Sequence, residues 1–223
     1  MAKIKEIFKS IQGEGPFIGY QQLFIRFCGC NLNCSYCDTD FSPENILGEF
    51  SPQELVDYLN KLEISDIHSV SLTGGEPLIS YKFLKEFLPL IPNKKVLLET
   101  NATLVDELSE IIDFVDIVAA DIKLESATGS KNCFDLHKDF FDVAKSKNLF
   151  AKVVFNDKIS DFEISETCKL AKMFGIELVL QPQMINDNMA VSSDFAELIF
   201  AKFLSQYKNV RLIPQVHKFI NVQ

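Results

Sequence analysis

Three cysteines near the start of the chain are the residues best suited to carry chemistry. Cys30, Cys34 and Cys37 stand in a C-x3-C-x2-C spacing. Iron–sulfur clusters are held by cysteine thiolates, normally four, so three clustered ligands leave one iron of a cubane free to bind another molecule. With six cysteines placed at random, this spacing would arise with a chance of roughly 0.4%. The spacing therefore predicts a cluster with an open iron.

A structural zinc site is the main alternative use of these cysteines. Closed zinc sites normally need two ligand pairs, and neither a second CxxC nor an H-x3-5-H follows here. Cys28 forms a C-x-C with Cys30 and could donate a ligand instead. It ends the preceding strand pattern, however, and a small buried hydrophobe is the better interpretation. Cys133 and Cys168 stand alone and are interpreted as structural.

The composition restricts the class of partner. The chain has 223 residues, of which 47% are hydrophobic, and residues 1–223 are interpreted as a single domain. A net charge of −9 argues against a nucleic-acid partner, because such proteins need a basic face, and favours a small-molecule substrate. No signal peptide and no run of roughly 18 apolar residues is found, so we expect a cytoplasmic, reducing location and no membrane partner.

Strand patterns alternate with helix patterns along the chain. Strands are predicted over residues 22–27, 69–72, 95–99, 115–120, 149–155 and 176–180. Capping boxes at Ser51 with Glu54 and at Ser160 with Glu163 predict two helix starts, and Gly175 predicts the end of the second helix. Other helices are predicted from about residues 80 and 103, over 135–147 and over 193–206.

This alternation predicts an α/β fold with a parallel sheet. About six strand–helix units fall short of the eight of a closed barrel, so we expect a partial, open parallel (β/α) barrel, with an open doubly wound sheet as the alternative. In both folds the functional loops follow the carboxyl ends of the strands. The cysteine loop directly follows the strand pattern QQLFIRF and would lie at that end.

Five motifs together resemble one enzyme family. The cysteine run with an aromatic residue before its last cysteine is similar to the signature of the radical S-adenosylmethionine (SAM) superfamily. The combination, which covers about a fifth of the chain in the expected order, resembles the 7-carboxy-7-deazaguanine synthases. Its motifs are IQGEGPFIG at 11–19, RFCGCNLNCSYCDTDF at 26–41, TGGEP at 73–77, ETN at 99–101 and VHKF near the C-terminus.

The resemblance implies a radical SAM lyase of the queuosine route. Its members convert 6-carboxy-5,6,7,8-tetrahydropterin to 7-carboxy-7-deazaguanine and release ammonia. A reduced 4Fe-4S cluster cleaves SAM, the 5'-deoxyadenosyl radical abstracts the C6 hydrogen, and Mg²⁺ assists. The resemblance also implies a homodimer and a reductant protein, either flavodoxin or ferredoxin.

The resemblance assigns roles to residues at matching positions. Metal ligands are Cys30, Cys34 and Cys37 for the cluster and Thr39 for Mg²⁺. Substrate contacts are Ile11, Gln12, Gly13, Arg26, Thr73 and Gln223, and catalytic roles fall on Arg26, Glu14, Glu99 and His217. Cofactor contacts are Tyr36, Cys37, Asp38, Gly75, Asp121, Ile122, Lys123, Gln181, Pro182, Gln183 and Met184.

The residue types suit these roles, although each has an ordinary structural alternative. Arg26, one of two arginines, offers a planar fork for the pterin carboxylate, but it could be an exposed strand residue. Gln12 and Glu14 can pair with a pterin edge, or form a polar turn. The TGGEP glycines let a backbone approach a ligand, or form a turn. Thr39 could equally cap a turn.

The chain departs from the family pattern in two places. Asp121, Ile122 and Lys123 stand where many relatives have Ser-Pro-Lys, and Gln223 replaces a C-terminal proline that touches substrate.

Two other functions are compatible with the cysteines alone. A glycyl-radical activating enzyme uses the same cluster spacing, although IQGEG and CDTD argue against it, and a zinc-stabilised binding module would lack catalysis.

Overall fold

A single nine-stranded sheet organises the chain in the computed structural model, which describes residues 1–37, 39–62, 64–185 and 187–222. The strand order is β11-β8-β7-β6-β5-β4-β2-β1-β3. The strands are β1 (Ala2–Ile11), β2 (Gln21–Phe27), β3 (Gly48–Phe50), β4 (Ser69–Gly74), β5 (Val96–Thr100), β6 (Ile117–Asp121), β7 (Asn148–Phe155), β8 (Glu177–Pro182) and β11 (Val210–Leu212). A separate hairpin contains β9 (Met184–Ile185) and β10 (Asn188–Met189).

Helices follow most of these strands. They are α1 (Pro52–Leu59), α2 (Tyr81–Phe87), α3 (Val105–Ser109), α4 (Glu125–Thr128), α5 (Phe134–Ala144), α6 (Asp161–Phe174), α7 (Ser193–Gln206) and α8 (Val216–Phe219). Short 3-10 turns are η1 (Gly15–Phe17), η2 (Pro77–Ser80), η3 (Leu88–Leu90) and η4 (Ile112–Phe114). None of the described helices is long and apolar enough to span a membrane.

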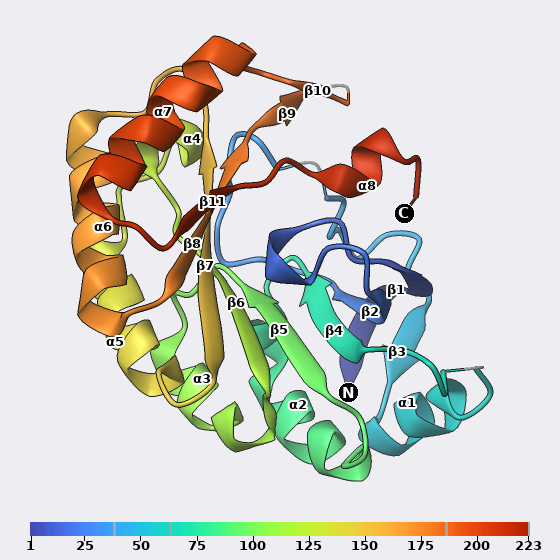
Figure 1. The fold of residues 1–223 in the computed structure, drawn as a ribbon. Helices are drawn as coiled ribbons and strands as arrows, with labels where there is room; N and C mark the ends of the chain where they lie inside the picture. Colours follow the sequence, from blue (N-terminus) through green and yellow to red (C-terminus); the bar gives the residue numbers. More distant parts are fainter. Residues whose placement is uncertain (38, 63, 186, 223) are drawn as a thin grey trace.

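The parallel part of the sheet forms an open barrel. Seven strands form this part, in the order β2, β4, β5, β6, β7, β8 and β11, and each pairs in parallel with the next of the series. Right-handed crossovers that always advance in one direction place the helices on one face, and Figure 1 shows α2, α3, α5, α6 and α7 in an arc outside the sheet. A doubly wound sheet would reverse its strand order. The predicted open barrel is confirmed, with seven parallel strands where about six were predicted.

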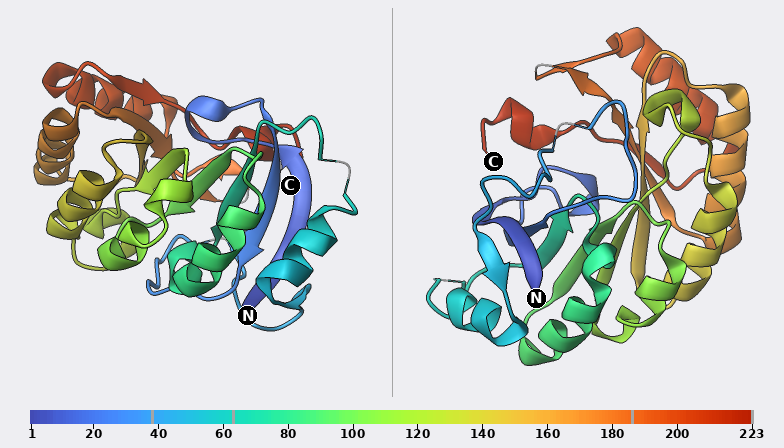
Figure 2. Two further views of the ribbon diagram at one scale, coloured as in Figure 1. Left: turned by 90° about the horizontal axis from the view of Figure 1, so that it is seen from below. Right: turned by 180° about the vertical axis from the view of Figure 1, so that it is seen from behind.

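Two antiparallel strands of the main sheet, β1 and β3, were absent from the sequence prediction. β1 pairs with both β2 and β3 near one edge of the sheet, and both views in Figure 2 show this strand beginning at the N-terminus. A register shift between Ile4 and Glu6 interrupts the alternation of buried and exposed residues in β1. Strand prediction depends on that alternation, so the bulge hides the strand in the sequence. β3 and β11 have three residues each, too few to show a pattern.

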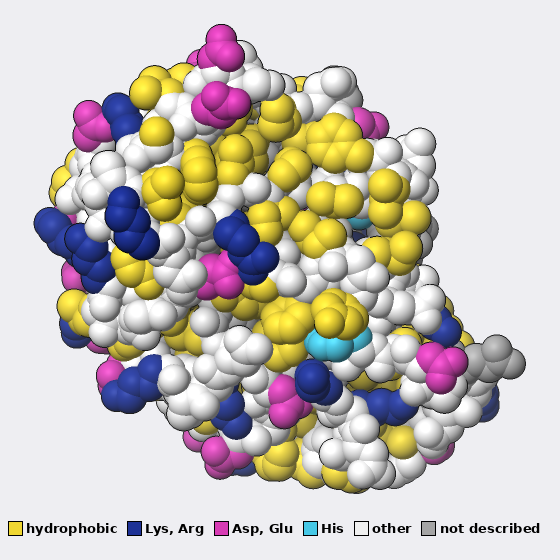
Figure 3. All heavy atoms as spheres, viewed as in Figure 1, with side chains coloured by type: hydrophobic (Ala, Val, Ile, Leu, Met, Phe, Trp, Pro, Cys, Tyr) yellow, Lys and Arg dark blue, Asp and Glu magenta, His cyan; other side chains and the backbone are white. Residues whose placement is uncertain are grey.

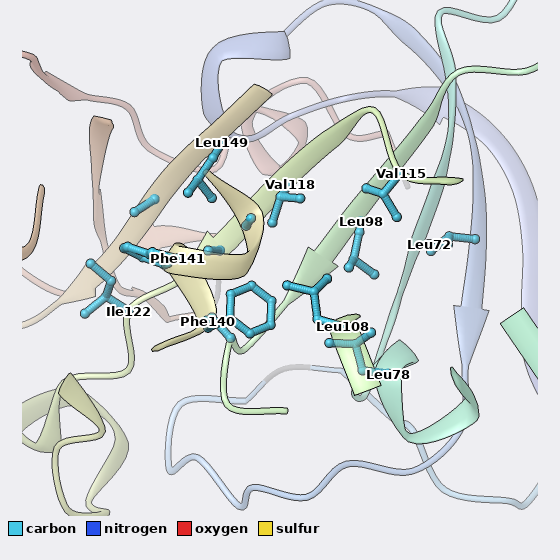
Figure 4. Close-up of a cluster of buried hydrophobic side chains, with 14 of the residues drawn as sticks. Leu72, Leu78, Leu98, Leu108, Val115, Val118, Ile122, Phe140, Phe141 and Leu149 are labelled. Atoms are coloured by element: carbon cyan, nitrogen blue, oxygen red, sulfur yellow. The ribbon is translucent and has the colours of Figure 1, made fainter. Parts of the chain in front are cut away.

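The main core lies between the sheet and the helices. Figure 4 shows Leu72, Leu98 and Val118 of three adjacent strands facing Leu108 of α3 and Phe140 of α5. Both predicted capping boxes are present, at the starts of α1 and α6, and Gly175 ends α6 with φ +66°. These local signals were readable because they depend on residues only three apart.

The inner face of the sheet changes character along the strands. Leu97, Ile117, Phe150 and Val179 form a small apolar cluster, and Phe17 from η1 packs against it. Further toward the carboxyl ends, the same faces of β5, β6 and β7 present Glu99, Asp121 and Lys152. The interior is therefore filled by apolar side chains toward the amino ends of the strands and lined by polar side chains toward the carboxyl ends.

Candidate active site

A cavity of about 510 Å³ opens at the carboxyl ends of the parallel strands. Its walls come from inner faces of the strands, from the β1–β2 loop, from the cysteine loop after β2 and from the C-terminal segment that carries α8. This is the end of the sheet at which parallel α/β folds place their ligands.

The cysteine loop is fixed to the neighbouring strand ends. The amide of Glu76 donates to the Gly29 carbonyl at 2.8 Å, and the amide of Gly75 donates to the Phe27 carbonyl at 3.1 Å. Ser35 donates through its hydroxyl to the Ala127 carbonyl at 2.8 Å. The loop between β2 and β3 is thus held from the end of β4 on one side and from α4 on the other.

The glycines of TGGEP are explained by this close approach. A Cβ at position 75 would lie 1.8 Å from the Gly29 carbonyl oxygen, and one at position 74 would lie 2.3 Å from the Phe27 carbonyl oxygen. Gly74 also has φ +122°. The sequence suggested that these glycines admit a ligand, whereas the structure shows that they first admit the backbone of the cysteine loop.

The three clustered thiols suit an iron–sulfur cluster. Cys30, Cys34 and Cys37 all line the cavity, and burial raises the pKa of the Cys30 and Cys34 thiols. Among the described residues, no three His, Cys, Asp or Glu side chains converge on one ion position. A cubane does not need such convergence, because each thiolate binds a different iron. The donor set therefore fits three corners of a 4Fe-4S cluster.

Asn101 links the next strand end to the cluster loop. Its Nδ2 lies 3.9 Å from Cys30 Sγ and donates to Asn31 Oδ1 at 2.7 Å. Its backbone amide donates to Glu76 Oε2 at 2.8 Å. Burial raises the pKa of Glu76 to about 7, although Asn101, Leu78 and Thr100 all donate to it and oppose the rise.

Glu99 accepts hydrogen bonds from two residues that were predicted to contact the substrate. Gln12 Nε2 and Ser71 Oγ donate to Glu99 Oε1 at 3.0 and 3.1 Å, and Thr73 Oγ1 donates to Oε2 at 3.3 Å. Gln12 also donates to Gln22 Oε1 at 3.0 Å. One carboxylate therefore orients side chains from the β1–β2 loop and from β4.

Arg26 lies on the inner wall, with two contacts that restrict its orientation. Its Nε is 2.7 Å from Glu6 Oε1, and its guanidinium carbon lies 5.6 Å from the Phe8 ring centre. Phe8 in turn stacks on Phe24 at 5.0 Å. Arg26 is only partly exposed, so the alternative of a solvent-facing strand residue does not hold.

A row of buried charges crosses the cavity wall. Lys152 Nζ lies 2.5 Å from Glu14 Oε2 and 3.3 Å from Asp121 Oδ1. Lys123 Nζ lies 3.0 Å from both Asp121 Oδ2 and the Tyr36 hydroxyl. Burial alone would raise the pKa of Glu14, but Lys152, together with Gln215 and His217, outweighs burial and holds the pKa at about 2. The carboxylates in turn raise the pKa of Lys152 against the effect of burial.

Most of the predicted site residues meet at this cavity. Its lining includes Ile11, Gln12, Gly13, Glu14, Arg26, Cys30, Cys34, Tyr36, Cys37, Thr39, Thr73, Gly75, Glu99, Asp121, Lys123, Gln181 and His217. Gln181 Oε1 is buried and has no hydrogen-bond partner among the described residues, so it offers an acceptor to a bound molecule, as a cofactor contact would.

Other predicted residues lie elsewhere. Ile122 is buried in the main core, and Gln183 accepts from Asn156 Nδ2 at 3.0 Å. Pro182 ends β8 and Met184 begins β9, and neither belongs to the cavity lining. Asp38 and Gln223 lie outside the described residues. Cys28 does not line the cavity, but it is half-buried and not the buried hydrophobe that was predicted. Cys168 is buried in the core, as expected of a structural residue.

Lys152 and Gln215 line the cavity but were missing from the predicted site. Lys152 had a readable signal, because a lysine within the apolar strand run FAKVVF is unusual in a parallel sheet. Gln215 Nε2 donates to Glu14 Oε1 at 2.7 Å. It belongs to a polar segment more than 200 positions from Glu14, and its sequence context carries no signal of that contact.

Comparison with known proteins places the chain in a family. Residues 24–178 match the Radical SAM superfamily. The chain is 46% identical to a 7-carboxy-7-deazaguanine synthase from Methanothermobacter thermautotrophicus, covering 100% of this chain and 98% of the relative. It is 33% identical to a synthase of the same name from Geobacter sulfurreducens, covering 98% and 97%.

A solved structure agrees at the level of the fold. The crystal structure of QueE from Escherichia coli matches with a TM-score of 0.68 at 21% identity, over 97% of this chain and 94% of that one. The chain belongs to the 7-carboxy-7-deazaguanine synthase family of radical SAM enzymes.

Proposed function

We propose that this chain contracts the ring of 6-carboxy-5,6,7,8-tetrahydropterin to give 7-carboxy-7-deazaguanine and ammonia. One observation carries the proposal. The thiols of Cys30, Cys34 and Cys37 line the same cavity as the Arg26 guanidinium and the Glu14 carboxylate. A cluster-binding loop and groups complementary to a carboxylated pterin therefore face one space.

The residues of the chain bind and orient the reactants. Cys30, Cys34 and Cys37 would hold the cluster, which would supply the electron for reductive cleavage of bound SAM. Arg26 pairs with the substrate carboxylate through its planar fork. Glu14 and Gln12 accept hydrogen bonds from the amino group and the ring N–H of the pterin. The apolar cluster around Phe17 excludes water from the opposite end of the barrel.

Several finer assignments belong to the same proposal. Thr39 lines the cavity and offers a hydroxyl oxygen to Mg²⁺, whereas Asp40 is engaged by Lys5 at 2.6 Å. Flavodoxin or ferredoxin would supply electrons in the cytoplasm, where thiols stay reduced. Residues 1–223 would act as one domain, because a single sheet includes strands from Ala2 to Leu212.

A homodimer is also part of the proposal. In Figure 3 hydrophobic side chains gather over the face that carries α7, β9 and α8. Exposed large hydrophobic residues of these elements and their surroundings include Ile185, Leu198, Phe219 and Ile220. Light scattering of the purified protein would measure its mass, and a mass of one chain at all concentrations would contradict the dimer.

The decisive experiment is anaerobic reconstitution and turnover. The protein is loaded with iron and sulfide and incubated with carboxytetrahydropterin, SAM, a reductant and Mg²⁺. We expect about four irons per chain and formation of 7-carboxy-7-deazaguanine, and loss of the cluster on substitution of Cys30, Cys34 or Cys37 by alanine. Cys28→Ala is the matched control and should retain the cluster. An intact cluster without product would refute the proposed reaction.

A further inference from the structure

Lys152 is a buried cation, and its ion-pair partners indicate its role in the site. Its side chain is 7% exposed and extends from the inner face of β7 into the cavity wall. A buried ammonium is unfavourable unless it is paired, and Lys152 is paired twice, with Glu14 at 2.5 Å and Asp121 at 3.3 Å. Only Glu14 belongs to the loop that faces the proposed substrate.

The surroundings of Glu14 make Lys152 its principal counter-charge. Within the described part of the chain Glu14 forms its one ion pair with Lys152, and Gln215 donates to its other oxygen. His217 of the C-terminal segment is a more distant positive influence. The other charges near Lys152 are Asp121 and Glu99, which would disfavour a second ionised carboxylate if the lysine were absent.

The charge of Glu14 matters for the proposed ligand. A 2-amino-4-oxopteridine presents two adjacent donors, the exocyclic amino group and the ring N3–H. An ionised carboxylate is acceptor-only and can receive both, whereas a protonated one presents a donor to one of them. Hydrogen bonds to an ionised carboxylate are also the stronger kind.

We propose that Lys152 is a positioning residue that keeps Glu14 ionised and aimed into the cavity, so that Glu14 selects the 2-amino-4-oxo edge of a pteridine. This inference rests on the proposed function. Lys152 acts through Glu14 and does not touch the reacting atoms. It is therefore a determinant of substrate binding rather than of the radical step.

The primary test is the pH dependence of KM in Lys152→Met. In the wild-type enzyme Glu14 stays ionised from pH 8.5 to pH 6, because its pKa is about 2. Loss of the ammonium raises that pKa, so the ionised fraction falls as the pH falls. We expect KM for carboxytetrahydropterin to rise about 10-fold or more between pH 8.5 and 6 in the variant, with a smaller change in kcat.

The matched control is Lys138→Met on α5, where the lysine side chain is 54% exposed. This variant should show the same dependence of KM on pH as the wild-type enzyme. The comparison with the wild type also corrects for titration of the substrate itself. If Lys152 had a purely structural role, Lys152→Met would lower thermal stability and cluster content, but KM would not gain a new dependence on pH. A Lys152→Met enzyme with the wild-type KM profile would overturn the inference.

Glu14→Gln and the double variant test the route of the effect. The double variant removes both charges, while Asp121 keeps Lys123 as its partner, so it should fold even if Lys152→Met does not. If Lys152 acts through Glu14, adding Lys152→Met to Glu14→Gln should change substrate affinity in calorimetry by less than about 3-fold. A further loss of about 10-fold would show another route and refute the proposal.

These outcomes are separable from the proposed function. A wild-type enzyme that makes no 7-carboxy-7-deazaguanine would refute the reaction itself. Wild-type turnover combined with an unaltered Lys152→Met profile would refute only the role of Lys152. A 2,4-dioxo analogue of the substrate adds a specificity measurement, because it lacks the amino donor. The wild type should prefer the amino compound, and Lys152→Met should reduce that preference about 10-fold.

Discussion

At the scale of single residues, the polar side chains of the cavity are oriented by neighbouring side chains of the same wall. Arg26 is restricted by Glu6 at Nε and by the ring of Phe8. Gln12 and Thr73 are oriented by Glu99. Groups fixed before binding lose less conformational entropy when the ligand arrives.

Arg26→Lys tests the planar fork at this scale. A lysine keeps the positive charge but cannot form two parallel hydrogen bonds with a carboxylate, so we expect KM for carboxytetrahydropterin to rise about 10- to 100-fold. The cluster content, measured as iron and acid-labile sulfide, should stay unchanged. Arg211→Lys is the control, because Arg211 pairs with Glu177 at the other edge of the sheet. Equal effects of the two substitutions would exclude a specific role for Arg26.

At the scale of elements, the site depends on how closely β2 and β4 approach at their carboxyl ends. Gly75 and Glu76 donate backbone hydrogen bonds to Phe27 and Gly29, immediately before the first cluster cysteine. The strands pair in register up to Phe27 and Gly74. The position of the cysteine loop is therefore set by a backbone contact and not only by its own sequence.

Gly75→Ala should disturb that contact. The added methyl group would meet the Gly29 carbonyl oxygen at 1.8 Å, so the two loops must separate. We expect iron content after reconstitution to fall below about half of the wild-type value, since ligand geometry governs cluster binding. Gly129→Ala is the control. A Cβ there meets no atom within 4 Å, and the residue has φ +76°, so it should cost about 1 kcal/mol of stability and leave the cluster intact. Full cluster content in Gly75→Ala would contradict this account.

At the scale of the whole molecule, distant segments meet around one row of charges. Glu14 comes from the β1–β2 loop, Asp121 and Lys152 from adjacent strands, and Gln215 from the C-terminal segment. That segment also packs at Gly13, where a Cβ would lie 2.4 Å from His217 Nδ1. The substrate side of the cavity is therefore completed by the last part of the chain.

Removal of residues 214–223 should impair substrate turnover and leave cluster assembly intact. The sheet ends at Leu212, and the cluster loop is held by contacts with α4 and with the segments that directly follow β4 and β5, so cluster assembly should persist. Gln215 and His217 would be lost, and we expect kcat/KM for carboxytetrahydropterin to fall by about 100-fold or more. Iron content and steady-state turnover of the truncated enzyme would measure this. Unchanged turnover would show that the C-terminal segment is not part of the substrate site.

The sequence by itself determined the local elements and the main chemical groups. The capping boxes at Ser51 and Ser160 and the αL glycine at 175 were predicted because each depends on neighbours within one helical turn. Six parallel strands were predicted because apolar runs bounded by turns need no knowledge of their partners. The cysteine spacing and the motifs of the family identified the cluster loop and most of the cavity lining.

Only the tertiary structure decided which groups pair across the cavity. The bulge in β1 hid a strand of ten residues, and the pairing of Arg26 with Glu6 depends on that strand. The pairing of Lys152 with Glu14 joins positions 138 residues apart. Such contacts arise from strand order and register, which a linear pattern does not contain. The electrostatic state of each buried group follows from those contacts, and so the chemistry of the site was complete only when the fold was known.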